Sequence, residues 1–142
     1  MVLSDATTKL GLEVAGQTSA GAGLIRLPST FTPTHMTSGL DGFPAVDVFG
    51  SPGALVVAGF WGRVTRLSGH PCSDGGSPGG AYGRSVYVHN AVNGRTRYVT
   101  HLDRVLVTLG QRIKPGTVIG TVCDSAVSGK PGTTHVHLGM KR

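Results

Sequence analysis

The sequence predicts an all-β protein, with antiparallel sheets arranged as a sandwich or a partly open barrel. Three observations indicate this class: short apolar runs, turn signals between the runs, and many glycines, which number 23 in 142 residues. Charged residues make up 14% of the chain, and the apolar residues do not follow a heptad period. Closely spaced short strands joined by turns are typical of sandwiches and barrels.

The N-terminal segment differs from the rest of the chain. Residues 1–30 have weak periodicity and many small residues, which predicts an extended arm or an irregular cover. Residues 31–142 are then a single domain, long enough to bury a core. The start of the chain lacks the basic and continuous apolar stretches of a secretory signal, and the sequence has no apolar run long enough to span a membrane. We therefore expect synthesis in the cytoplasm without a signal peptide.

The β pattern begins near residue 43. Gly59 separates two short apolar runs, and Asn93-Gly94 is a strong signal for the turn of a β-hairpin. The glycine-rich stretch 68–83 is expected to be a loop. The expected strands are two within 54–67, one over 84–90, one over 95–102, two within 105–122 around a Lys-Pro-Gly turn, and one over 134–140.

The chain is basic, with a formal net charge of +6 from 13 Lys and Arg against 7 Asp and Glu. This balance favours a polyanionic partner such as nucleic acid or an anionic cell surface, although a soluble basic protein needs no such partner. No nucleic-acid-binding motif is present, so we expect no nucleic-acid partner. The two cysteines, Cys72 and Cys123, do not form a CxxC pair, which argues against a structural zinc knot. A disulfide and two free thiols both stay open.

The strongest chemical signal is the pair His135 and His137 in the predicted last strand. Residues two apart in a strand point to the same face, so the two imidazoles project together while Val136 and Leu138 point into the core. A surface pair without a role is the alternative. His101 near the end of another strand and Asp47 at the start of the β region complete a donor set that zinc favours in hydrolytic sites.

The order of these segments resembles that of the lysostaphin-like M23 zinc endopeptidases of peptidoglycan. The matching stretches are "DVFGSPGALVVAGFWGRVTRLSG", "VYVHNAVNGRTRYVTHLDRVLVTLGQRIKPGTVIGTV" and "THVHLGM". Together they cover roughly residues 43–140, and the "LGQRIKPGTVIG" hairpin followed by His-x-His is the most specific part. The resemblance implies a lysostaphin-like peptidase fold.

The resemblance also implies a role for each matching residue. Asp47 and His137 correspond to zinc ligands, and His101 and His135 correspond to the catalytic histidines beside the zinc-bound water. The family's first ligand lies four residues before the aspartate, where this chain has Phe43. Two interpretations stay open. His35 folds back through "TSGLDG" and supplies the missing imidazole, or the metal is lost.

Two functions follow from the resemblance. The first is a zinc-dependent endopeptidase that cleaves peptide bonds in peptidoglycan stems or cross-bridges, as an endolysin or a virion-associated lysin acting at the bacterial cell wall. The second is a catalytically inactive domain that serves as a structural or wall-binding part of a phage tail. The expected partners are peptidoglycan and other virion proteins. Trp61, Tyr82 and Tyr87 are candidates for stacking on sugar or for lining the groove, but aromatic residues at strand positions are more often core.

Overall fold

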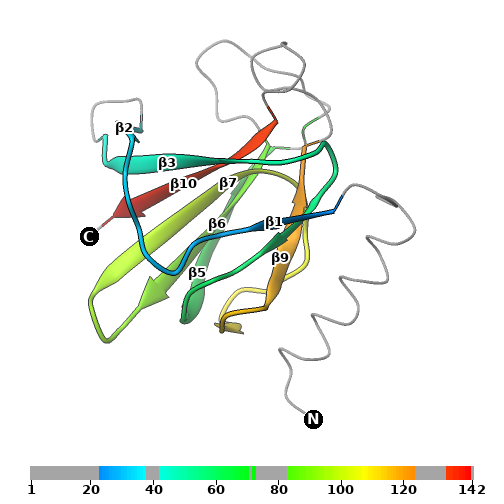
Figure 1. Cartoon of the computed structure of the whole chain (residues 1–142). Helices are drawn as coiled ribbons and strands as arrows, with labels where there is room; N and C mark the ends of the chain where they lie inside the picture. The colour runs from blue at the N-terminus through cyan, green and yellow to red at the C-terminus, as the bar shows by residue number, and fades with distance from the viewer. Residues whose placement is uncertain (1–22, 38–41, 71, 73–82, 124–133, 142) are drawn as a thin grey trace.

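The chain folds almost entirely into β-strands, in the computed structural model that describes residues 23–37, 42–70, 72, 83–123 and 134–141 (Figure 1). The strands are β1 (Leu24–Arg26), β2 (His35–Met36), β3 (Pro44–Phe49), β4 (Leu55–Val57), β5 (Gly62–Gly69), β6 (Arg84–Asn90), β7 (Arg95–Val105), β8 (Arg112–Ile113), β9 (Val118–Val122) and β10 (His135–Lys141). The predicted all-β class is therefore confirmed. Within the described residues no helix could cross a membrane.

The described strands form a single curled sheet with the order β1-β4-β9-β7-β10-β3-β2, and β6, β5 and β8 continue from the other edge of β7. This arrangement is closer to the predicted partly open barrel than to a sandwich of two sheets. The pairings are antiparallel except for β1, which runs parallel to β4. Leu24–Arg26 thus adds an edge strand to the sheet, and the boundary predicted near residue 30 stays a prediction because residues 1–22 lie outside the described part.

Strand β7 is where the sheet changes direction. Residues 96–100 pair with β10, whereas residues 102–105 pair with β9. His101 stands between the two stretches with φ 70°, in the left-handed region that residues other than glycine seldom adopt. The bend lets one strand belong to both arms of the curled sheet, and it places a histidine at the junction.

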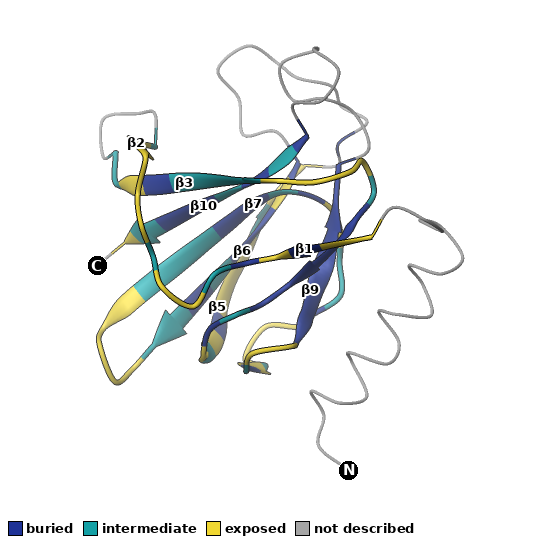
Figure 2. Cartoon of the chain, viewed as in Figure 1, coloured by how far each residue is buried: buried dark blue, intermediate teal, exposed yellow. Residues whose placement is uncertain are grey.

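The core lies on one face of the sheet and is built from branched aliphatic side chains. Strand β9 is buried along its whole length, because both of its faces are covered (Figure 2). On β10 the burial alternates, so Val136 and Leu138 are fully buried while His135 and His137 are partly exposed. The fully buried large side chains are Ile25, Leu102, Ile113, Ile119, Leu138, Val56, Val64, Val86, Val88, Val99, Val118 and Val122.

Cys72 and Cys123 form a disulfide across a sequence separation of 51 residues. Of the two alternatives that the sequence left open, a disulfide or two free thiols, the structure has the disulfide. The backbone N–H of Cys123 donates a hydrogen bond of 2.9 Å to the carbonyl of His101. The disulfide consequently lies directly behind the bend of β7. Gly83 packs there too, since a side chain at this position would meet Cys123 Sγ at 2.9 Å and His101 Cα at 3.0 Å.

Candidate metal and catalytic site

Strand β10 lies between β3 and β7 and carries the two histidines of the His-x-His segment. His137 is directly opposite Asp47 on β3 and opposite Thr100 on β7. Because side chains alternate along a strand, His135 and His137 share the face that Asp47 occupies. The register of three strands therefore brings together residues that are 90 positions apart in sequence.

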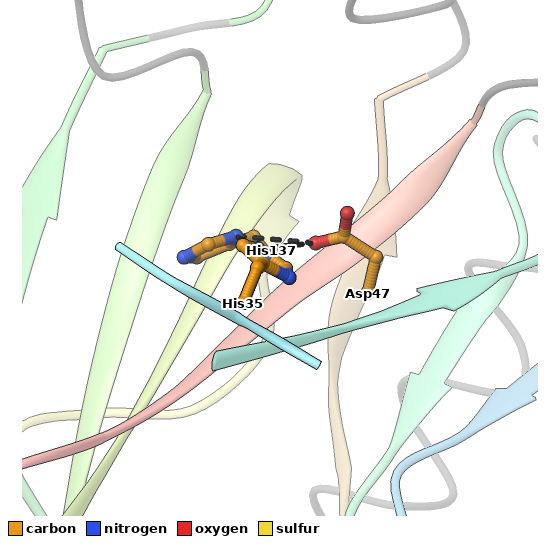
Figure 3. Close-up of side chains that lie close together, drawn as sticks. All are labelled: His35, Asp47 and His137. Carbon is orange, nitrogen blue, oxygen red and sulfur yellow. Dashed lines mark hydrogen bonds and ion pairs between the residues drawn. The ribbon is translucent and has the colours of Figure 1, made fainter. Parts of the chain in front are cut away.

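The short hairpin of β2 and β3 adds His35 to the same face. His35 is opposite Ala45, two residues before Asp47, so its imidazole lies diagonally from the carboxylate. His35 Nε2 is 3.5 Å from Asp47 Oδ1 and 3.3 Å from His137 Nδ1. His137 Nδ1 is in turn 3.2 Å from Asp47 Oδ1 (Figure 3). Three potential ligand atoms thus form a nearly equilateral triangle.

The triangle matches what a small tetrahedral cation requires. Zinc bound at about 2.0–2.1 Å by nitrogen or oxygen sets adjacent ligand atoms about 3.3–3.4 Å apart in a tetrahedron. The three observed separations lie between 3.2 and 3.5 Å. Two imidazoles and one carboxylate are also a donor set that zinc accepts. The residues present therefore fit a metal ion of this type.

Phe43 explains why the third imidazole comes from a different strand. Its ring covers Gly139 so closely that an added side chain there would meet Phe43 Cδ2 at 2.9 Å. The ring also contacts Tyr98 edge-on, with centroids 5.8 Å apart. Phe43 therefore fills the space beside β10 as an apolar contact. The imidazole of His35 reaches the carboxylate from β2 instead.

His135 and His101 flank the triangle. His135 Nε2 lies 3.7 Å from Asp47 Oδ1, and its ring is perpendicular to that of His101 at a centroid distance of 5.0 Å. The ring of His101 lies 6.0 Å from that of His137. The bend of β7 places His101 here, and an unusual backbone conformation held by the surrounding structure is common at functional positions.

The surroundings of His137 favour its neutral form. Burial lowers the pKa of His137, the hydrogen bond and charge of Asp47 oppose this, and the charges of His35 and His135 lower the pKa further. Thr37 Oγ1 lies 3.0 Å from Nε2, the ring nitrogen that faces away from Asp47. A second polar contact of this kind fixes the ring orientation of a ligand histidine. The neutral ring with its Nδ1 toward the triangle is the form that a metal needs.

All five residues predicted from the sequence, namely His35, Asp47, His101, His135 and His137, therefore lie in one cluster. Sequence reasoning missed two neighbours. Thr37 follows His35 by two residues, and this spacing on an extended segment was the available signal. Tyr98, whose ring is 6.2 Å from that of His137, carries no signal beyond its place on a strand.

Comparison with known protein families finds a match for most of the chain. Residues 43–142 match the family described as peptidase family M23, a segment that begins after His35. Among curated proteins, none matches the chain in sequence.

Solved structures share the fold at low sequence identity. Lysostaphin in solution has a TM-score of 0.53 and 18% identity, covering 86% of this chain and 48% of its own. The catalytic domain of EnpA, a prophage-encoded M23 protein from Enterococcus faecalis, has a TM-score of 0.52 and 21% identity, covering 81% of this chain and 85% of its own. LytU has a TM-score of 0.53 and 21% identity, covering 81% and 74%. This chain thus spans about half the length of lysostaphin.

Proposed function

Because this chain belongs to peptidase family M23, a family of metallopeptidases, we propose that it is a zinc-dependent endopeptidase that hydrolyses peptide bonds in peptidoglycan stems or cross-bridges. The observation that carries the proposal is the triangle of His35, Asp47 and His137, whose ligand atoms lie within 4.8 Å of one another. His101 and His135 stand beside it. No other group in the described part of the chain combines three ligand side chains in this way.

In this proposal His35, Asp47 and His137 hold the metal. Zinc, when bound, supplies a water of lowered pKa and polarises the scissile carbonyl. His135, whose Nε2 lies 3.7 Å from Asp47 Oδ1 at the side of the triangle, would take a proton from a reacting water and return it to the leaving amine. His101, packed edge-on against His135, donates a hydrogen bond to the oxygen that gains negative charge. Neutral imidazoles suit both tasks.

The bacterial cell wall is the proposed place of action, and the proposed role is that of an endolysin or a virion-associated lysin. The family and the lysostaphin-like fold support a peptidoglycan substrate. The prophage origin named for EnpA supports a phage role. Other virion proteins would then be partners.

A second candidate is a catalytically inactive structural or wall-binding part of a phage tail. Phe43 favours it, because an apolar ring stands at the position of the family's first ligand and packs against Gly139 and Tyr98. The two candidates differ in whether His35 completes the metal site.

Zinc content separates the two. The purified protein should carry about one zinc per chain, and His35→Ala, Asp47→Ala and His137→Ala should each lose it. Met36→Ala is the matched control, since Met36 is also in β2 and is 59% exposed. If His35→Ala keeps its zinc, His35 is not the third ligand. If the parent protein takes up no zinc at neutral pH, the inactive candidate stands.

A further inference from the structure

Trp61 stands on the surface where an aromatic strand residue was expected in the core. Its side chain is 61% exposed, and it is the one tryptophan of the chain. The backbone on both sides is held tightly. A side chain at Gly59 would collide with the carbonyl oxygen of Leu27, and one at Gly62 would lie 2.6 Å from Val88 Cγ1. The indole is therefore presented to solvent from a rigid backbone.

Two pockets flank the indole. The first, of about 260 Å³, is lined by Trp61 together with Phe60, Arg95 and Arg97. The second, of about 520 Å³, is lined by Trp61 with Arg63, Arg112 and the apolar Val92. Asn90 contributes to both pockets. Ligand pockets combine aromatic side chains with a few polar groups that orient the ligand, and both pockets beside Trp61 have this combination.

The charges around the indole are all of one sign. Arg95 and Arg97 line the first pocket and Arg63 and Arg112 line the second, while the described carboxylates, Asp47 and Asp103, line neither. We call Trp61 with these four arginines the Trp61 ridge.

The guanidinium of Arg97 is fixed in place within this ridge. It donates a hydrogen bond of 2.7 Å to the carbonyl of Ser29 and lies 4.6 Å from the ring centre of Phe60. Burial lowers the pKa of Arg97, and the charge of Arg95 lowers it further. Arginine nevertheless stays charged in proteins. Arg95 and Arg97 are two residues apart on β7 and so share a face, where their like charges repel each other and a bound anion would relieve the repulsion.

The ridge is separate from the metal site. The β6–β7 hairpin, where Asn90 pairs with Arg95, lies at the lower left of Figure 1, away from β2 and β3. His137 pairs with Thr100, which follows Arg95 by five positions and Arg97 by three along β7, and these intervals correspond to about 17 and 10 Å of extended strand. A ligand on the ridge would leave the metal site accessible.

We propose that the Trp61 ridge binds an anionic polysaccharide, with a sugar ring against the indole and phosphate or carboxylate groups on the arginines. Planar guanidinium groups recognise both kinds of anion through paired hydrogen bonds. Asn90 supplies an amide for sugar hydroxyls. The choice of a polysaccharide over other polyanions rests on the proposed action at the cell wall. The ridge would hold the protein on the wall while the metal site reaches a peptide.

Intrinsic fluorescence tests the proposal directly, because the signal comes from Trp61 alone. The protein is titrated in a metal chelator with poly(N-acetylglucosamine 1-phosphate), hyaluronate, a neutral N-acetylglucosamine hexamer and single-stranded oligothymidylate. We expect a saturable change with at least one of the two anionic polysaccharides, and binding of the neutral hexamer at least about tenfold weaker. A response to poly(N-acetylglucosamine 1-phosphate) alone identifies phosphate as the recognised group, and one to hyaluronate alone identifies carboxylate. No change, or tighter binding of oligothymidylate, overturns the proposal.

Charge variants show whether binding is local to the ridge. Arg95→Gln and Arg112→Gln should each weaken binding about tenfold, as expected for the loss of one charge-assisted contact. Arg104→Gln, an exposed arginine near the other end of β7, removes the same charge and should change binding less than twofold. Equal weakening by Arg104→Gln would mean non-specific attraction and would overturn the proposal. Thermal unfolding of each variant excludes loss of folding.

Trp61→Ala gives an independent readout on isolated cell walls. Its cosedimentation with walls in chelator should fall at least about tenfold, while hydrolysis of a short soluble peptide should match that of the parent. Unchanged cosedimentation would overturn the proposal. If the parent binds walls but hydrolyses nothing with zinc added, the proposed function fails while the ridge proposal stands.

Discussion

The metal site and the Trp61 ridge differ in the arrangement of their charged groups. In the metal site, Asp47 is surrounded by imidazoles at 3.2, 3.5 and 3.7 Å, so its carboxylate has several partners. In the ridge, four arginines line the pockets beside Trp61 with no described carboxylate among them. The metal site concentrates potential ligand atoms in one small volume, whereas the ridge spreads its cations, with Arg63, Arg95 and Arg112 exposed and Arg97 half-buried.

This difference indicates two kinds of ligand. Ligand atoms 3.2 to 3.5 Å apart fit one small cation, because a larger group would not enter the triangle. Arginines spread over two pockets fit an extended polyanion, whose charges repeat along a chain. The curled sheet holds both, because β2, β3 and β10 supply the metal site, while β5, β7 and β8 supply the arginines of the ridge.

Separate changes to the two histidines of β10 should give the largest effects. His137→Ala removes a proposed ligand, so zinc affinity and activity should both fall steeply. His135→Ala leaves the ligand triangle intact, so zinc should stay bound while activity falls about 10²–10⁴-fold. His101→Ala should resemble His135→Ala. Metal analysis and the release of amino groups from peptidoglycan measure the two effects.

The assignment is reversed if His135→Ala loses zinc and His137→Ala keeps it. If both variants hydrolyse peptidoglycan as the parent does, the enzymatic function is wrong. Met36→Ala is again the control, because Met36 is an exposed residue of β2 that does not belong to the ligand triangle.

Removal of the disulfide should destabilise the protein next to the metal site, because Cys123 is adjacent to His101. Cys72 and Cys123 close a loop of 51 residues, and removing such a crosslink costs about 4 kcal/mol in the chain-entropy estimate. Denaturant unfolding of Cys72→Ala/Cys123→Ala against the parent measures this. The backbone N–H of Cys123 donates a hydrogen bond to the carbonyl of His101. Activity of the double variant should therefore also fall at temperatures where the variant stays folded. Two freely alkylated thiols in the folded parent would contradict the pairing.

The conformation of His101 predicts a trade between stability and activity. With φ 70°, an ordinary side chain costs about 1 kcal/mol relative to glycine. His101→Gly should therefore be about 1 kcal/mol more stable than His101→Ala, while both lose activity to the same extent. Chemical denaturation of the two variants in chelator provides the comparison. Equal stability would show that the bend does not require a left-handed residue.

The pH dependence of stability gives the smallest effect. Burial lowers the pKa of His137 in the folded protein below its ordinary value of about 6.5. Between these two values the unfolded chain binds more protons than the folded one, so the free energy of unfolding rises with pH. The gain is complete above about pH 6.5 and is lost as pH falls toward the lowered value. His137→Gln in chelator should flatten this part of the curve, whereas Arg95→Gln should not.

Local sequence patterns predicted the strands from residue 54 onward and the identity of the chemical groups, but they did not predict β1 and β2. Alternation predicted the strands that became β6 and β10, and Asn93-Gly94 predicted the hairpin turn, where Gly94 has φ 70°. These features depend on neighbours within a few residues, so local periodicity and turn chemistry are sufficient. The shared face of His135 and His137 followed from the same two-residue period.

The contacts between segments far apart in the sequence became clear only from the tertiary structure. Whether His35 reaches Asp47 depends on the pairing of β2 with β3, and Phe43 alone left both outcomes open. The bend at His101 arises because β7 pairs with β10 and then with β9 on the same edge. Trp61 is a large aromatic residue of the kind that usually packs in a core, yet its side chain is 61% exposed where the chain enters β5. Each of these depends on strand register and packing between segments far apart in sequence, which local patterns do not encode.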